Sequence, residues 1–532
     1  MRPLILVRGF GGPFLGGVQR NAYQGFNDGT VYPGRRGENY IYEGFVLRAL
    51  KYAEHPYRDA TNVVGYYAKP QAALPGKWNW DADLLTGRVV LDPATADRVL
   101  GDGVGGTLWI YRYYDLEPRT MKGYGEGLVR LIDIIRRAAA QRDEPFHGVD
   151  IVAHSMGGLV VRAALRELSV MDGRAGELIH RIVTLGTPHR GIAFQVLPRG
   201  LVEQLPGLAS TADELAAFDP DSTEFRHWGE WFPLERVLTV VGTDYRSYGI
   251  DVASLGNRLA SLADEGSLVY NRSDGLVKQA SAQLPGAPRT FVHKCHGGGD
   301  SLVTSREAFE IAMRFFHGTH RVRLWLDDAE VRRGKDFFGR SEFYFGASVK
   351  PRGVDFDLFH QSPEAENCYG PFRSDRLTDG PPSLKEELTR PLSAEGDATT
   401  GWAGPDRLIW EGWFDRSVRP VTPSGATGVV FRLDVYLGER DSFGVGFSDN
   451  VVFRKQYYVQ LLPGDRPVLY VHTGEARLGE GQQELDAAAR EEDSGVVRAA
   501  ETAKPNEWRF PVGGTGFGAT LRAAFQADDG SA

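Results

Sequence analysis

The sequence predicts an α/β domain, built on a mostly parallel sheet flanked by helices, followed by an all-β sandwich domain. First, strand-like and helix-like segments alternate along the first part of the chain, as in parallel sheets with helical crossovers. Second, the later segments are short, alternating and aromatic-rich, with Gly, Pro and Asp between them. Third, 532 residues with 42% hydrophobic composition suffice for two or three packed cores. We expect domains at 1–319 and 320–532.

In the first domain, each expected strand is a short apolar run, and each expected helix repeats apolar residues at helical spacing. The expected strands are residues 2–9, 61–67, 107–115, 149–153, 180–191, 235–245 and 287–295. The expected helices are residues 42–53, 127–141, 159–168 and 305–318.

In the second domain, the expected strands alternate apolar and polar residues, as strands with one buried face do. They are residues 320–331, 341–350, 354–360, 428–439, 455–462, 467–474 and 519–526. Two charged, weakly periodic stretches, 375–405 and 478–507, are predicted to be surface excursions with a short helix each.

Composition excludes several classes of protein. With 61 Lys and Arg against 70 Asp and Glu, the net charge is −9, and no basic run is interleaved with aromatic residues, so nucleic acid is not an expected partner. Two cysteines, Cys295 and Cys368, exclude a disulfide-dense secreted scaffold. The first residues lack the apolar core and cleavage site of a signal peptide, and no stretch approaches the roughly 18 apolar residues of a spanning helix. We therefore expect a cytoplasmic protein.

One segment, residues 149–168, changes from a strand pattern to a helix pattern in its middle. Ser155 stands at the junction and is followed by Gly157 and Gly158, whose small size allows strand and helix backbones to approach each other closely. At the carboxyl end of a parallel strand, such a turn exposes the serine Oγ beside the N–H groups of the next helix. The bend therefore presents a nucleophile.

This turn, with the sequence AHSMG, resembles the G-x-S-x-G nucleophile elbow of the α/β-hydrolase superfamily, with Ala in the first position. Residues 6–13, LVRGFGGP, resemble the HGFGG oxyanion loop of lipases, with Arg8 in place of the usual His. The resemblance implies that the backbone N–H groups of Phe10 and Met156 form an oxyanion hole.

The same superfamily places an acid and then a histidine after the nucleophile in the chain. Asp274, in NRSDGLV, resembles the acid of the NDGLV segment of bacterial lipases, and Asp244 at the end of the preceding strand is the alternative. His296 lies in a Gly-rich loop after the last strand and is the expected base. His293, which alternation places within that strand, is the alternative base.

A further segment, TLGTPHRGI at residues 184–192, is similar to the GTPHxG segment of lipases and of the lecithin-cholesterol acyltransferase-like and GPI inositol-deacylase-like families. Together the motifs cover residues 1 to about 317. The apolar and aromatic stretch at 191–235 lies where these relatives carry a cap or lid, and we expect a lid there. Core helices packed on the sheet are the alternative.

The start of the second domain, residues 324–349, loosely resembles the first strands of C2-type sandwiches. Clustered carboxylates at one end of a sandwich hold calcium through hard oxygen ligands, whereas solvated surface is the usual role of acidic loops. The acidic candidates are Asp327, Asp328, Asp336, Glu342, Glu439 and Asp441.

The resemblance implies a serine hydrolase that cleaves carboxylic esters, with lipid-like acyl esters as substrates, through a Ser155, His296 and Asp274 triad. The reaction requires no metal and no other cofactor. An acyltransferase and a catalytically silent binding or adaptor protein are the alternatives. We expect the sandwich to dock the protein on a membrane, a lipid surface or a protein partner. Candidate contacts are the exposed aromatic residues among 343–345, 410–414 and 456–459, about half of which alternation places in the core.

Overall fold

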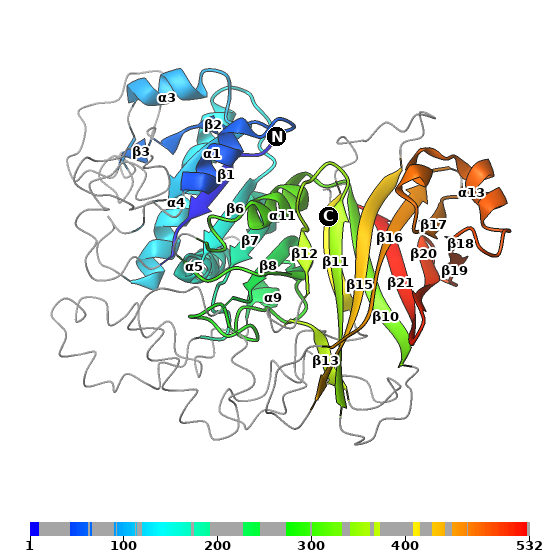
Figure 1. Ribbon diagram of the computed structural model, residues 1–532. Coiled ribbons are helices and arrows are strands. Elements are labelled where there is room, and N and C mark those ends of the chain that lie inside the picture. Colours follow the sequence, from blue (N-terminus) through cyan, green and yellow to red (C-terminus); the bar gives the residue numbers. More distant parts are fainter. Residues whose placement is uncertain are drawn as a thin grey trace, which may run out of the picture. The chain divides into compact units, whose positions relative to one another are not determined.

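The computed structural model divides the chain into two compact units (Figure 1). One consists of Met1–Pro288 with Lys294–Phe309, and the other of Arg289–His293 with Glu310–Ala532. The structure describes residues 1–9, 43–61, 64–65, 90–91, 93–111, 113, 120–171, 175–191, 227–244, 273–297, 300–331, 341–361, 367–372, 408–414, 428–441, 450–464 and 466–528.

A parallel sheet organises the N-terminal part of the chain. In the described residues it has seven strands in the order β2-β5-β1-β6-β7-β8-β9. The strands are β1 (Leu4–Val7), β2 (Arg58–Asp59), β5 (Thr107–Tyr111), β6 (Val149–His154), β7 (Ile179–Leu185), β8 (Val237–Gly242) and β9 (Arg289–Val292). The pairs β2–β5, β1–β5, β1–β6, β6–β7 and β7–β8 are all parallel. The predicted fold class is therefore confirmed for this part of the chain.

The expected strand at 61–67 is not a strand of this sheet. Its described part, β3 (Val64–Gly65), pairs antiparallel with β4 (Val90–Leu91) in a separate two-stranded sheet. The edge strand of the parallel sheet, which pairs with β5, is β2. Ala60, directly after β2, donates its N–H to Leu108 O at 2.9 Å. Asp59 Oδ1 accepts the N–H of Thr61 at 2.8 Å, which turns the chain away where the apolar run begins.

The helices bury the sheet. They are α1 (Glu43–Lys51), α3 (Pro93–Leu100), α4 (Met121–Ala140), α5 (Met156–Met171), α6 (Ala175–Leu178), α9 (Trp228–Trp231) and α11 (Arg306–His317). Ile5, Trp109 and Ile151 share one buried cluster with the apolar residues of α4 and α5, which lie side by side (Figure 1). Gly125 permits this approach, because an added Cβ would lie 2.7 Å from the backbone carbon of Ala163.

The other unit contains two antiparallel sheets, as expected for a sandwich. In the described residues, one has the order β14-β10-β21-β20-β19 and the other β12-β11-β15-β16-β17-β18, with β13 paired to β11. The strands are β10 (His320–Val331), β11 (Ser341–Pro351), β12 (Phe359–His360), β13 (Tyr369–Phe372), β14 (Leu408–Phe414), β15 (Val429–Asp441), β16 (Asn450–Leu462), β17 (Val468–His472), β18 (Val496–Arg498), β19 (Ala500–Glu501), β20 (Glu507–Gly514) and β21 (Phe517–Ala527).

Aromatic side chains join the two sheets. The ring centroids of Phe345 and Phe517 lie 6.1 Å apart, and those of Phe431 and Phe525 lie 6.4 Å apart, so each pair connects a strand of one sheet to a strand of the other. The stretch 478–507 contains the expected short helix, α13 (Gln482–Ala488). It also contains the end of a 3₁₀ turn (Glu475–Gly479) and the strands β18 and β19, which were not expected. The stretch 375–405 lies outside the described residues.

The aromatic residues proposed as docking contacts are buried in the sandwich. Each of the eight aromatic side chains has an exposed fraction below one tenth. They are Phe343, Tyr344, Phe345, Trp410, Trp413, Phe414, Tyr457 and Tyr458. Since a docking contact must be exposed, the expectation that these side chains face a lipid surface or a partner is wrong.

In the part of the chain that the structure describes, no helix is long and apolar enough to cross a membrane.

The acidic candidates for calcium are not gathered into a site in the described residues, where no group of three or more His, Cys, Asp or Glu side chains is placed to hold a metal ion. Asp327 instead forms ion pairs with Arg509 at 2.7 Å and with Arg522 at 2.9 Å. Asp336 lies outside the described residues, as do the side chains of Glu342 and Asp441.

Candidate active site

Ser155 occupies a strained turn between β6 and α5. Its φ of +52° makes it one of three non-glycine residues with positive φ in the described part of the chain, and this region is costly for a residue with a Cβ. The surrounding structure holds it there. Ser155 donates its N–H to Leu185 O at 2.9 Å, and Ser155 O accepts the hydroxyl of Thr187 at 3.0 Å and the N–H of Gly158 at 3.1 Å.

Glycines around this turn allow close backbone packing. A Cβ on Gly157 would lie 2.5 Å from Val7 O, and one on Gly9 would lie 2.8 Å from Ser155 Cβ. A Cβ on Gly158 would collide with the Thr187 side chain. The glycines of the AHSMGG segment are therefore required by contacts with β1 and with the loop after β7.

Ser155, His296 and Asp274 form a continuous hydrogen-bonded chain. Ser155 Oγ lies 2.8 Å from His296 Nε2, and Asp274 Oδ2 lies 2.8 Å from His296 Nδ1. A carboxylate only accepts, so Nδ1 carries a proton, and in that tautomer of the imidazole Nε2 can accept the serine hydroxyl. The exposed fractions are 5% for Ser155, 3% for His296 and 0% for Asp274. The arrangement can therefore move a proton away from Ser155 Oγ.

The tight turn SDGLV holds the acid. Asp274 Oδ1 accepts the N–H groups of Leu276 at 3.1 Å and Val277 at 2.7 Å, which leaves Oδ2 for the histidine. Gly275 provides the left-handed backbone of this turn with a φ of +99°. His296 also donates its N–H to Asp274 O at 2.8 Å. Asp274 and His296 are thus joined by both backbone and side chain.

The two alternative residues, Asp244 and His293, lie just after β8 and β9. The carboxylate that reaches His296 is that of Asp274, while the backbone N–H of Asp244 bonds to Lys294 O at 3.2 Å. β9 ends at Val292, so His293 follows the strand and does not lie within it, contrary to the alternation pattern. The imidazole that reaches Ser155 Oγ is that of His296.

Two further glycines make room for the acid. A Cβ on Gly242, the last residue of β8, would lie 2.6 Å from Asp274 Cβ, and one on Gly186, directly after β7, would lie 2.8 Å from Asp274 Oδ2. Gly186 also has a φ of +56°. Sequence reasoning missed both, because each glycine lies inside a predicted strand, directly after its apolar run.

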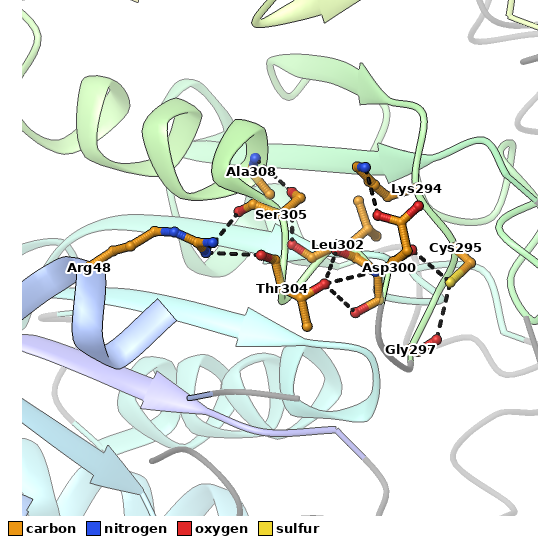
Figure 2. Close-up of polar contacts among 10 residues, drawn as sticks. Arg48, Lys294, Cys295, Gly297, Asp300, Leu302, Thr304, Ser305 and Ala308 are labelled. Carbon is orange, nitrogen blue, oxygen red and sulfur yellow. Dashed lines mark hydrogen bonds and ion pairs between the residues drawn. The ribbon is translucent and has the colours of Figure 1, made fainter. Parts of the chain in front are cut away.

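The loop that carries His296 is tied together by its neighbours (Figure 2). Cys295 Sγ lies 3.1 Å from Gly297 O and 3.0 Å from Asp300 O, so the single thiol proton can serve either carbonyl. Burial, and next the nearby Asp244 carboxylate, raise the pKa of Cys295 to about 11, which keeps that proton in place. Lys294 Nζ pairs with the Asp300 carboxylate at 2.6 Å.

The end of this loop is anchored to the start of α11 and to α1 (Figure 2). Ser305 Oγ accepts the N–H of Ala308 at 3.0 Å and so caps α11. Arg48 of α1 donates from Nη1 to Thr304 O at 2.9 Å and to Ser305 O at 3.4 Å. The sequence held no signal for Arg48 or Cys295, because their partners are backbone carbonyls.

Of the expected oxyanion donors, Met156 is the first residue of α5, and Phe10 lies outside the described residues. The chain just before Phe10 is held by Tyr113, whose hydroxyl lies 3.0 Å from Arg8 O and 3.1 Å from Gly9 O. As the first residue of α5, Met156 carries one of the N–H groups that an α-helix leaves without an intrahelical partner, and it directly follows Ser155 in the chain.

Most of the expected lid, residues 192–226, lies outside the described residues. Its described end forms α9, where Trp228 is 1% exposed and belongs to the same core cluster as α5. This end of the segment is therefore part of the core, which was the alternative interpretation.

These features define a class of protein. A parallel sheet with a serine on a strained turn after an inner strand, followed along the chain by an aspartate and a histidine, is the architecture of an α/β hydrolase. A model of the PGAP1-like alpha/beta domain family matches residues 112–197, which include the serine turn and the GTPHRG segment. No curated protein shows significant sequence similarity to the chain.

Solved structures that match the chain include three bacterial proteins. The lin2722 gene product of Listeria innocua is 13% identical, with 59% of this chain and 93% of that chain covered and a TM-score of 0.31. Phospholipase PlaB of Legionella pneumophila is 11% identical, with 85% and 91% covered and a TM-score of 0.30. A putative cell surface hydrolase of Lactobacillus plantarum WCFS1 is 10% identical, with 59% and 90% covered and a TM-score of 0.28. Such low scores leave function to be argued from the site itself.

Proposed function

We propose that this protein is a serine hydrolase that cleaves carboxylic esters of lipid-like acyl groups. Ser155 Oγ attacks the ester carbonyl carbon while His296 Nε2 takes the hydroxyl proton. The bond to the alcohol then breaks as His296 returns the proton to the alcohol oxygen, which leaves an acyl group on Ser155. Water then attacks the acyl carbon while His296 again takes a proton and returns it to Ser155 Oγ, which releases the carboxylic acid product and restores the serine. Asp274 holds the imidazole in the required tautomer and balances its charge.

One observation carries this proposal. Ser155 Oγ, His296 Nε2 and Nδ1, and Asp274 Oδ2 are linked by two contacts of 2.8 Å, and the serine stands on a turn with a φ of +52°. Strain of this kind persists only where the surrounding structure enforces it, and it is concentrated at active sites. A serine that served only to cap α5 would need no buried imidazole hydrogen-bonded to it and no carboxylate bonded to that imidazole.

The substrate class is proposed from the motifs. The segments RGFGG, AHSMGG, GTPHRG and SDGLV each resemble segments of lipases and related esterases, and the matched family model is of a hydrolase-type domain. No structural observation favours an acyltransferase or a silent binding protein over a hydrolase, so these alternatives become outcomes of the test.

The test uses Ser155→Ala in the full chain. We expect the loss of the acyl-enzyme route to lower kcat on p-nitrophenyl esters by about a million-fold, with fluorophosphonate labelling abolished. Ser348→Ala is the matched control, because Ser348 Oγ also lies within hydrogen-bond distance of a histidine, His360 Nδ1, at 2.6 Å. The control should be labelled and active.

Retained activity or labelling in Ser155→Ala would contradict the proposed nucleophile. A wild-type protein that neither labels nor turns over any ester would be the silent binding protein. A chain-length series of p-nitrophenyl esters, with phospholipid and triglyceride substrates beside it, tests the acyl class. Adding an acceptor alcohol and analysing the products separates hydrolysis from acyl transfer.

A further inference from the structure

His154, the last residue of β6, contacts the loop that carries the base. It is 5% exposed, and its Nε2 lies 2.9 Å from the backbone carbonyl oxygen of His296. A carbonyl oxygen only accepts, so His154 Nε2 must carry the proton and donate it. The nucleophile turn therefore bonds to the base through a second histidine, in addition to the Ser155 hydroxyl.

The ring of His154 stands between three parts of the site. Its centroid lies 4.9 Å from that of His296, with the planes tilted by 39°. On the side of β1, a Cβ added to Gly9 would lie 3.0 Å from His154 Nδ1 and 2.8 Å from Ser155 Cβ. The imidazole thus fills the space between the end of β1, the nucleophile and the base loop.

We propose that His154 is a positioning residue, which holds the main chain at His296 so that Nε2 stays within reach of Ser155 Oγ. This inference rests on the proposed hydrolase function. Asp274 O accepts the N–H of His296 at 2.8 Å, and His154 donates to the carbonyl of the same residue. With both backbone groups bonded, only the side-chain torsions of His296 remain to set the contact with Ser155.

Gly297 makes this bond important. Because glycine adopts many backbone conformations, the peptide after His296 is not restrained by the next residue itself. The His154 donor supplies the missing restraint on the carbonyl direction. Misplacement of a reacting group by about 1 Å can cost roughly a hundred-fold in rate.

The neutral state of His154 fits this role. Burial, and next the proximity of His296, hold the pKa of His154 well below its usual range. His296 becomes an imidazolium when it takes the serine proton, and a second positive charge on a neighbouring ring would oppose that step. A neutral donor fixes the loop without adding such a charge.

The test compares His154→Met, which fills the space without a donor, with His154→Gln, whose amide nitrogen can donate from near the position of Nε2. We expect kcat for a p-nitrophenyl ester to fall about 10- to 100-fold in His154→Met, with KM within about three-fold of wild type. His154→Gln should restore kcat to within about five-fold of wild type. His154→Leu serves as a second donor-free variant if His154→Met does not fold.

The matched control for lost stability is Ile135→Val in α4, a fully buried residue of the core cluster, which should lower the denaturant midpoint of unfolding and leave kcat unchanged. A folded donor-free variant with wild-type kcat would overturn the proposal. So would a His154→Gln variant as slow as His154→Met, because the donor would then be irrelevant. Activity in Ser155→Ala would instead overturn the hydrolase function itself, whatever the His154 variants do.

Discussion

Each unit of the molecule contains a serine, a histidine and an aspartate in proximity, and only one set can relay a proton. In the α/β unit, Ser155 and Asp274 bond to different nitrogens of His296. In the sandwich, Ser348 of β11 lies opposite His360 of β12, with Oγ 2.6 Å from Nδ1.

In the sandwich cluster, the Asp357 carboxylate approaches the same nitrogen, His360 Nδ1, at 3.8 Å, and it also pairs with Arg432 at 3.1 Å. The His360 side chain is 47% exposed, whereas the side chain of His296 is 4% exposed. A base needs one nitrogen for the nucleophile and the other for the acid, in a site that excludes water. A serine, a histidine and an aspartate close together therefore do not by themselves define a candidate triad. The serine and the aspartate must bond to different nitrogens of the imidazole.

Removing the imidazole should have the largest effect, and only in the α/β unit. We expect His296→Ala to lower kcat by about a million-fold, because in such a relay loss of the base costs as much as loss of the nucleophile. His360→Ala should retain kcat within about two-fold. Steady-state kinetics on a soluble p-nitrophenyl ester measures both.

Fluorophosphonate labelling should be lost with His296→Ala and retained with His360→Ala. His293→Ala is a further control, since the ring that reaches Ser155 is that of His296. If His293→Ala were the inactive variant, the base would have been assigned to the wrong histidine.

The next effect comes from the two aspartates. Asp274→Asn should lower kcat about ten-thousand-fold, because an amide in place of the carboxylate favours the wrong imidazole tautomer while the fold is kept. Asp357→Asn removes a partly exposed ion pair and should change the free energy of unfolding by less than about 1 kcal/mol, with kcat unchanged. Loss of activity in Asp244→Asn but not in Asp274→Asn would instead assign the acid to Asp244, just after β8.

Sequence reasoning named the three residues that the structure joins by hydrogen bonds, because each lies in a short motif with a characteristic local backbone. Ser155 stands where a strand pattern meets a helix pattern, and Asp274 lies in a turn that needs Gly275. Arg48 and His154 were not identified, because they bond to backbone carbonyls that lie nearby only in the folded chain. Cys295 was not identified as a bonded residue either, because its partners are backbone carbonyls, which any residue type supplies. Such contacts leave no periodic or compositional signal.

The fold, too, could be predicted in part from the sequence. The sequence predicted a parallel sheet followed by a sandwich, and the long strands β10, β11 and β15 agree closely with the expected segments. β14 and β20 were missed, because short aromatic runs beside charged stretches resemble loops. The membership of 61–67 in the main sheet was wrong, because apolar content alone does not identify a strand's partner.

The smallest expected effect concerns a buried histidine without a bonded carboxylate. His472 of β17 is fully buried, and its Nε2 lies 3.3 Å from Gln460 Oε1. Burial lowers the pKa of His472 to about 4, while the nearby Glu480 and Arg477 act in opposite directions. The unfolded chain therefore binds more protons than the folded chain between about pH 4 and 6.5, and stability falls as the pH is lowered through that range.

For His472 this linkage amounts to about 2 kcal/mol between pH 7.5 and pH 5. His472→Gln, which cannot gain a proton, should remove that part of the pH dependence. Hydrogen exchange of the β16 and β17 amides, corrected for the intrinsic effect of pH, measures the opening free energy in each protein. An unchanged pH dependence in the variant would mean that His472 accepts a proton without cost, as a histidine bonded to a carboxylate does.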